Sequence, residues 1–192
     1  MTKNNGTSNT GAIAKTAAAL ALACLVAITA GCNKREWLKM TGKLKKPVNI
    51  ITVHEIVKYP MAKRLEKHID TFSGQKVWIN INPFIHSDVI KKIELAPRDE
   101  KGEFYDLKLF LNHKGRLRWM QLSNAFAHEK VGLVIDGVFY RSFLPKPMVG
   151  EYDDGEKTYV LIEGPFDKGT AEAVQKHAED NYLYYNDDDV EP

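Results

Sequence analysis

The chain has 192 residues, of which 44% are hydrophobic and 27% are charged. One ordinary domain is expected, because domains usually contain about 100–200 residues, and this composition excludes a disordered chain. Lys3 and Lys15 are the only charged residues among the first 32, so 25 basic residues remain beside 25 acidic residues after position 32. A neutral domain argues against nucleic-acid binding, which depends on neutralising phosphates.

The first 32 residues have the layout of a secretory signal. A polar, acid-free stretch that contains Lys3 and Lys15 precedes an apolar run from Thr16 to Ala30. This run is short for a bilayer span, which needs about 20 apolar residues. Small residues then lead directly into Cys32, as in a bacterial lipobox, although Thr29 stands where leucine is usual. The pattern predicts signal cleavage and lipidation at Cys32.

The expected mature chain begins with a tether. Residues 33–46 carry six lysines or arginines and one glutamate, which suits either a solvated tether or an interfacial helix at an anionic membrane surface. Residues 47–185 are expected to form the domain, and residues 186–192 an acidic tail. Residues 33–192 contain no cysteine, so this domain must be stable by packing alone.

The distribution of apolar and turn residues predicts the elements in chain order. The first half reads as a strand over 48–57, a helix from Pro60 to Gly74, a strand over 75–82, a helical turn at 87–88, and strands over 93–96 and 103–111. Met61, Leu65 and Phe72 supply the spacing of the first helix.

The second half contains a predicted hairpin. Asp136-Gly137 lies between apolar runs at 131–135 and 138–140, and an Asp-Gly pair favours a two-residue turn. Asp136→Asn is expected to leave the stability of the domain nearly unchanged, since asparagine is also favoured in this turn. A helix over 114–124, a strand over 158–162 and a last helix complete the pattern. Asp167 is expected to cap this last helix, with Ala171, Val174 and Ala178 on one apolar face. Together these elements predict an α+β fold, with an antiparallel or mixed sheet and helices packed on one face.

No catalytic, metal or cofactor site is predicted. The six histidines form no H-E-x-x-H pair, and no cysteine is available after Cys32 to complete a zinc pattern. No serine lies in a G-x-S-x-G motif, and no glycine-rich phosphate loop is present. The chain is therefore expected not to be an enzyme, although a hydrolase with an unrecognised site remains one alternative.

Aromatic residues after the predicted turn form a candidate peptide-binding surface. Phe139, Tyr140 and Phe143 lie near the edge of an expected sheet, where an extended polypeptide can add a strand. The alternative is that these rings belong to the core and to cross-strand pairs.

Five motifs occur along the chain in the order found in a known family. They are Pro83 with Asp88-Val89, then Asp99, Gly102 and 107–111, then Trp119 with Ser123, then 133–137, and finally Ile162, Gly164, Phe166, Ala171 and Ala173. From about residue 77 the chain resembles the head subdomain of the first periplasmic domain of the SecD/SecDF protein-export translocase family. The family's membrane helices have no counterpart after Cys32, so the chain is expected to be a stand-alone lipoprotein.

The resemblance implies an α+β fold and binding of extended polypeptide. We therefore expect a membrane-anchored, non-enzymatic interaction module of the bacterial cell envelope. Its partners are the membrane, reached through the lipid anchor, and an extended polypeptide or envelope protein. The anchor is expected on the outer side of the cytoplasmic membrane or on the outer membrane. A structural lipoprotein that docks onto an envelope complex is the alternative, and it predicts a flat apolar patch in place of a groove.

Overall fold

The computed structural model describes residues 46–61, 64–151, 154 and 157–186. The predicted signal segment, Cys32, most of the tether and the acidic tail after Asn186 therefore lie outside the described residues. The elements are β1 Ile51–Glu55, β2 Glu66–Asp70, β3 Lys76–Asn80, β4 Ile85–His86, the short helix η1 Ser87–Val89, β5 Ile90–Pro97, β6 Phe104–Leu111, α3 His113–Ala125, β7 Val131–Ile135, β8 Val138–Phe143, β9 Val160–Asp167 and α4 Lys168–Tyr185.

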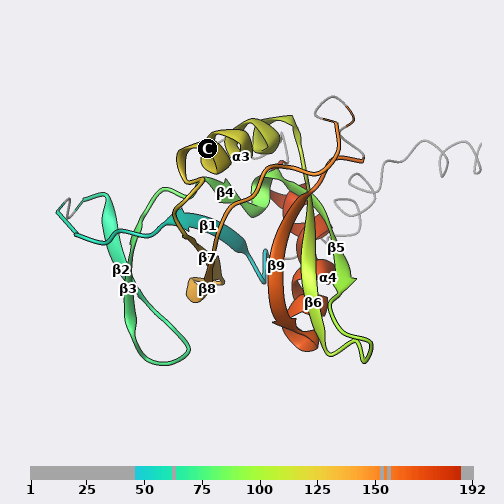
Figure 1. Cartoon of the computed structure of the whole chain (residues 1–192), viewed down its shortest axis with the longest axis horizontal. Coiled ribbons are helices and arrows are strands. Elements are labelled where there is room, and N and C mark those ends of the chain that lie inside the picture. The colour runs from blue at the N-terminus through green and yellow to red at the C-terminus, as the bar shows by residue number, and fades with distance from the viewer. Residues whose placement is uncertain (1–45, 62–63, 152–153, 155–156, 187–192) are drawn as a thin grey trace, which may run out of the picture. The chain divides into compact units, whose positions relative to one another are not determined.

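The described strands form three antiparallel sheets, where the sequence suggested one (Figure 1). Their strand orders are β4-β1-β7-β8, β2-β3 and β5-β6-β9. Helix α4 packs against β5, β6 and β9, while α3 contacts β4 and β6. The α+β class predicted from the sequence is confirmed.

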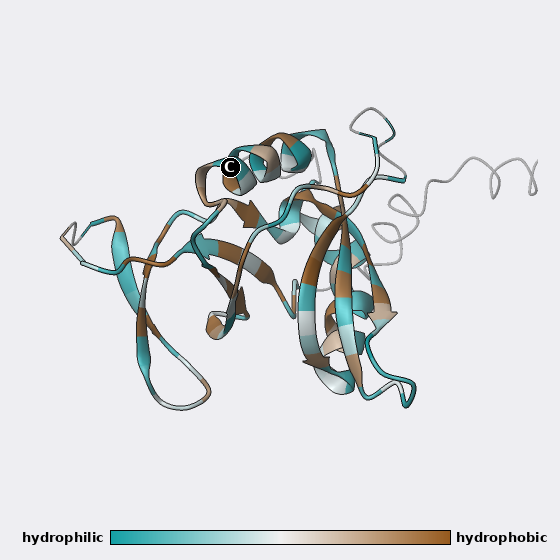
Figure 2. Ribbon diagram, in the orientation of Figure 1, coloured by the Kyte–Doolittle hydropathy of each residue, from teal (hydrophilic) through white to brown (hydrophobic). Residues whose placement is uncertain are grey.

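The main core joins the inner faces of α4 and the sheet β5-β6-β9 to buried residues of α3 and of the sheet β4-β1-β7-β8. Along β6 and β9 every second residue faces the core: Leu107, Leu109 and Leu111 of β6 and Val160, Ile162 and Phe166 of β9 are buried. In Figure 2 hydrophobic and hydrophilic colours follow each other along these strands. Ala171, Val174 and Ala178 form the buried side of α4, as the sequence predicted. Asp167 caps α4 as expected, because its side chain accepts a hydrogen bond from the Thr170 backbone N–H.

The predicted helix from Pro60 to Gly74 is wrong. Residues 66–70 form strand β2, which pairs with β3 and buries Ile69 opposite Val77. Gly74 closes the turn between the two strands at φ +76°, where the Thr71 hydroxyl also donates to the Gln75 carbonyl. Pairing with β3 outweighs the helical spacing, because it buries Ile69 and satisfies the backbone of both strands.

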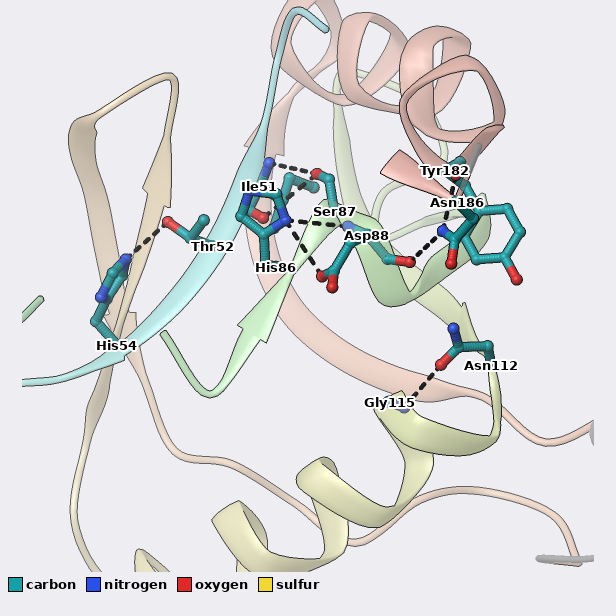
Figure 3. A network of polar contacts seen from close by, with 10 residues as sticks. All are labelled: Ile51, Thr52, His54, His86, Ser87, Asp88, Asn112, Gly115, Tyr182 and Asn186. Atoms are coloured by element: carbon teal, nitrogen blue, oxygen red, sulfur yellow. Dashed lines mark hydrogen bonds and ion pairs between the residues drawn. The ribbon is translucent and has the colours of Figure 1, made fainter. Parts of the chain in front are cut away.

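A polar network joins the start of β1 to distant parts of the chain (Figure 3). The Ser87 hydroxyl accepts from the Ile51 N–H at 2.9 Å and donates to the Ile51 carbonyl at 3.3 Å. The Asn186 amide, at the end of α4, donates to the Asp88 carbonyl at 2.7 Å. Helix η1 is therefore the junction at which β1, β5 and α4 meet.

The hairpin predicted at Asp136-Gly137 is confirmed. Both residues have positive φ, 48° and 81°, and Ile135 faces Val138 across the turn. The expectation for Asp136→Asn is not supported, because the carboxylate accepts two hydrogen bonds from the start of β1. The donors are the N–H groups of Asn49 at 3.0 Å and Ile50 at 2.8 Å. This turn therefore also holds the entry to the first strand.

Substitutions in this turn test both roles. Gly137→Val should lower the free energy of unfolding by more than about 1 kcal/mol, because β-branched residues resist positive φ. Gly137→Asn is the matched control and should be nearly neutral, since asparagine tolerates this conformation and no atom lies within 4 Å of the position of an added Cβ. Asp136→Asn should cost about 1 kcal/mol, because its amide has one acceptor oxygen for two donors. Urea melts measure all three, and a fully stable Gly137→Val variant would contradict the turn.

Candidate functional site

The three aromatic residues predicted to bind peptide do not share one surface. Phe139 is 8% exposed and packs with Ile69, Ile79 and Val134 in a second, smaller core cluster. Phe143 is 6% exposed and stacks on Trp119 in the main core, with ring centroids 6.2 Å apart. Of the three side chains, that of Tyr140 is left to line a surface groove.

A β-bulge places Tyr140 at this surface. Val134 pairs with Phe139 and Leu133 pairs with Arg141, so Tyr140 is the extra residue in β8. A bulge turns a side chain away from the regular alternation of its strand. The neighbouring aromatic residues on β8 can therefore enter two different cores while Tyr140 lies between them.

Tyr140 lines a cavity of about 460 Å³. We call this cavity the Tyr140 groove, and its lining residues are Phe72, Tyr140, Arg141, Pro165, Asp167 and Thr170. They come from the β2–β3 turn, from β8, from the end of β9 and from the first turn of α4. Segments far apart in the sequence therefore build one surface feature.

Two aromatic rings form one side of the Tyr140 groove. The Phe72 ring meets the Tyr140 ring edge to face, with centroids 5.8 Å apart, and Phe72 is 74% exposed. On its other side, Tyr140 stacks on the buried Phe166 at 5.2 Å with an interplanar angle of 4°. Tyr140 is thus fixed by the core, while Phe72 offers its apolar surface to a ligand.

The Tyr140 hydroxyl is tied to the cap of α4. It donates to Asp167 Oδ2 at 3.1 Å, while Oδ1 of the same carboxylate accepts from the Thr170 N–H at 2.9 Å. The backbone hydrogen bond from Thr170 holds the pKa of Asp167 below its ordinary value. Burial and the hydrogen bond to Asp167 raise the pKa of the Tyr140 phenol. Tyr140 is therefore a neutral hydrogen-bond donor and Asp167 a charged acceptor at neutral pH.

Arg141 supplies the positive charge of the Tyr140 groove. Its Nη1 donates to the Pro165 carbonyl at 3.3 Å, and its guanidinium lies 5.7 Å from the Phe166 ring centroid. Its buried Nε has no hydrogen-bond partner among the described residues. A buried donor without a partner costs about 1–3 kcal/mol. The rest of the Arg141 side chain lines the groove, where its guanidinium can donate to a ligand.

The Tyr140 groove combines an exposed aromatic ring, a guanidinium and a helix cap. The described residues contain no group of three or more histidine, cysteine or acidic side chains able to hold a metal. In the Tyr140 groove, the Thr170 N–H and the Asp167 carboxylate form the cap of α4. The sequence predicted Tyr140 as a candidate peptide-binding residue and Asp167 as a helix cap. It placed Phe72 in a helix and did not indicate Arg141 or Pro165 for binding.

The histidines near β1 have structural contacts. His54 is 5% exposed, with Nδ1 2.8 Å from the Asn80 carbonyl and Nε2 2.8 Å from the Thr52 hydroxyl. Burial lowers its pKa. His86 contacts Asp88 (Figure 3). Its ring also meets the Tyr185 ring edge to face, with centroids 4.7 Å apart. Burial alone would raise the pKa of Asp88, but the hydrogen bond from His86 and nearby positive charges bring it below its ordinary value.

No model of a protein family matches the chain, and a search of curated proteins also found no match. Among solved structures, the chain is similar to SecDF, described as a membrane component that enhances protein export, with 12% identity and a TM-score of 0.48 over 80% of this chain and 71% of that chain. A super-membrane-facing form of SecDF gives 11% identity and a TM-score of 0.46, over 80% of this chain and 21% of that chain.

A third structural neighbour is SecDF from Thermus thermophilus, described as a translocon-associated membrane protein. It gives 9% identity and a TM-score of 0.37, over 71% of this chain and 29% of that chain. The structural neighbours are thus SecDF chains, from the family that the sequence motifs resemble. Within the part of the chain that the structure describes, no helix is long and apolar enough to cross a membrane.

The double role of Asp167 can be tested by substitution. Asp167→Ala should lower the free energy of unfolding by about 1–2 kcal/mol, because it removes the cap of α4 and the acceptor of the Tyr140 hydroxyl. Asp167→Asn should cost less, since asparagine is also a good N-cap.

The pH dependence of the stability lost in Asp167→Asn shows whether the negative charge of Asp167 stabilises the fold. Folding holds the pKa of Asp167 below its unfolded value of about 3.8, so its charge stabilises the fold above that pH. This contribution is lost as the pH falls through the folded pKa. The stability difference between the parent and Asp167→Asn should therefore be full near neutral pH and shrink in acid. If the stability difference between the parent and Asp167→Asn stays constant as the pH falls to the pKa of Asp167 in the folded protein, the negative charge of Asp167 does not stabilise the fold.

Proposed function

We propose that this chain is an envelope lipoprotein, anchored at Cys32, that binds extended polypeptide in the Tyr140 groove without catalysing a reaction. The single observation that carries the binding role is the exposed Phe72 ring beside Tyr140 in a groove that Arg141 also lines. An apolar ligand side chain would pack on Phe72, and a ligand carbonyl would accept from Arg141. The motif resemblance to SecD agrees with this choice of ligand.

The position of β8 supports an extended ligand. Among the described strands β8 lies at the end of its sheet. Its side chains pack against the β2–β3 side, and an isolated β-bridge between Thr71 and Phe139 joins the two backbones. An edge strand presents unpaired backbone groups that can pair with a polypeptide in strand conformation. A groove beside an edge strand is also what a peptide-binding module requires, whereas docking onto a complex would favour a flat patch.

The anchor is proposed from sequence alone. The apolar run before Cys32 and the small residues next to it support lipidation, and the basic residues of 33–46 suit an anionic surface. Fully extended, this tether spans about 50 Å at 3.3–3.6 Å per residue. The domain would therefore bind polypeptide close to the membrane that holds it, on the outer side of the cytoplasmic membrane or on the outer membrane.

Phe72→Ala tests the Tyr140 groove. The probe is fluorescently labelled α-lactalbumin, reduced and alkylated so that it stays unfolded, and the readout is fluorescence anisotropy with the full chain in detergent. Phe72→Ala should weaken binding about fivefold or more, because aromatic anchors dominate such contacts. Arg141→Met, which removes the donor and keeps an apolar stem, should weaken it as well.

Tyr59→Ala is the matched control for the loss of an exposed aromatic ring. Tyr59 is 82% exposed and lies between β1 and β2, outside the lining of the Tyr140 groove. Its removal should leave the affinity unchanged. Equal losses in Phe72→Ala and Tyr59→Ala would mean that the probe sticks to exposed aromatics in general. Unchanged affinity in Phe72→Ala and Arg141→Met would overturn the assignment of the groove.

Lipidation has a direct chemical test. Mass spectrometry of the mature protein from a bacterial host should find the N-terminus at Cys32 with diacylglycerol on its sulfur. Each buried methylene contributes about 0.8 kcal/mol to membrane binding, so multiple acyl chains should hold the protein in the membrane fraction. Cys32→Ala should leave it soluble or uncleaved. A mature N-terminus elsewhere without lipid would refute the anchor.

A further inference from the structure

A second and larger cavity, of about 620 Å³, lies against the sheet β5-β6-β9. We call it the lysine groove, and its lining residues are Lys91, Lys92, Glu94, Lys108, Phe110, Lys157 and Tyr159. None of them lines the Tyr140 groove. The lysine groove is therefore a distinct surface, and the proposed function does not use it.

The alternation of β6 explains why this surface is basic and aromatic. Leu107, Leu109 and Leu111 are buried in the main core, so Lys108 and Phe110 between them face the other side of the sheet. The Phe110 ring lies beside the Tyr159 ring, with centroids 5.8 Å apart and an interplanar angle of 45°. The outward face thus carries an apolar floor.

Two lysines lie over this floor. Lys92 Nζ is 5.5 Å from the Phe110 ring centroid, and Lys108 Nζ is 5.1 Å from the Tyr159 ring centroid. Cation–π contacts of this kind contribute about 0.5–1 kcal/mol at exposed sites. They favour an arrangement in which the ammonium groups stay near the rings, so less ordering is needed when a ligand binds.

The charges of the lysine groove are only partly balanced. Lys92 pairs with Glu94 at 2.5 Å, and Lys157 pairs with Asp154 at 3.1 Å. Glu94 is opposite Lys108 in the β5–β6 register, but its carboxylate pairs with Lys92, and among the described residues Lys91 and Lys108 form no ion pair with a carboxylate. Both line the cavity, so two ammonium groups are available to an anionic ligand on an otherwise neutral domain.

We propose that the lysine groove binds an acidic stretch of extended polypeptide. Aspartate or glutamate carboxylates of the ligand pair with Lys91 and Lys108, and the ligand's methylene groups pack on Phe110 and Tyr159. A sheet face with charges on separate strands matches the spaced carboxylates of an extended chain. The neutral net charge after Cys32 disfavours nucleic acid, since nucleic-acid binding needs many phosphate contacts.

The test is fluorescence anisotropy of a labelled peptide with alternating glutamate and serine, added to the full chain in detergent. The double variant Lys91→Ala/Lys108→Ala should lose about fivefold or more in affinity at low salt. Lys91→Arg/Lys108→Arg keeps both charges and should bind nearly as the parent does. A peptide with glutamine in place of glutamate should bind weakly to all variants. The parent's affinity should also fall as salt is raised.

The matched control is Lys130→Ala/Lys176→Ala, which removes the same charge from exposed positions outside the lysine groove. Its affinity should remain that of the parent, with circular dichroism confirming that all variants fold. Equal losses in the two double variants would show only general electrostatic attraction and overturn the site. A gain in affinity on truncation after Asn186 would show that the chain's own acidic tail fills the groove, which would also overturn binding of a separate polypeptide.

Discussion

The carboxylate of Asp167 joins three parts of the structure. One oxygen accepts from the Thr170 N–H and begins α4, and the other accepts from the Tyr140 hydroxyl on β8. Asp167 is also the last residue of β9, so it ends the strand where the helix starts. Because α4 closes the main core over β5, β6 and β9, the direction in which it leaves β9 determines how that core is filled. The same hydrogen bond ties β8 to this end of β9, which places Arg141 near Pro165.

Strand β8 connects the two hydrophobic clusters. Phe143 belongs to the main core, and Phe139 belongs to the cluster under the β2–β3 ribbon. The bulge at Tyr140 lies between these buried rings, so its side chain is left at the surface with little freedom to move. A binding surface supported in this way is rigid, which lowers the entropy lost when a ligand is ordered. Residues 33–192 have no cysteine, so this rigidity comes from packing and hydrogen bonds alone.

The two grooves differ in the side chains that line them. The Tyr140 groove is apolar, with a single guanidinium and a helix cap, while the lysine groove is cationic over an aromatic floor. Pro165, near the end of β9, lines the first, and Tyr159, just before β9, lines the second. A strand rises about 3.3 Å per residue, so these two positions are on the order of 20 Å apart along the chain. A single extended polypeptide of moderate length would therefore be long enough to reach both.

The sequence by itself determined the features that depend on near neighbours. These are the α+β class, the Asp136-Gly137 turn, the Asp167 cap and the buried side of α4, and each follows from local backbone preferences or a regular apolar spacing. The tertiary structure decided whatever depends on pairing between distant residues. Residues 66–70 became a strand because β3 lies beside them, and the bulge separated Tyr140 from Phe139 and Phe143. Phe72, Arg141 and Pro165 line one groove because the β2–β3 turn, β8 and β9 come together there. The spacing of residues along the sequence does not indicate which distant segments will be neighbours.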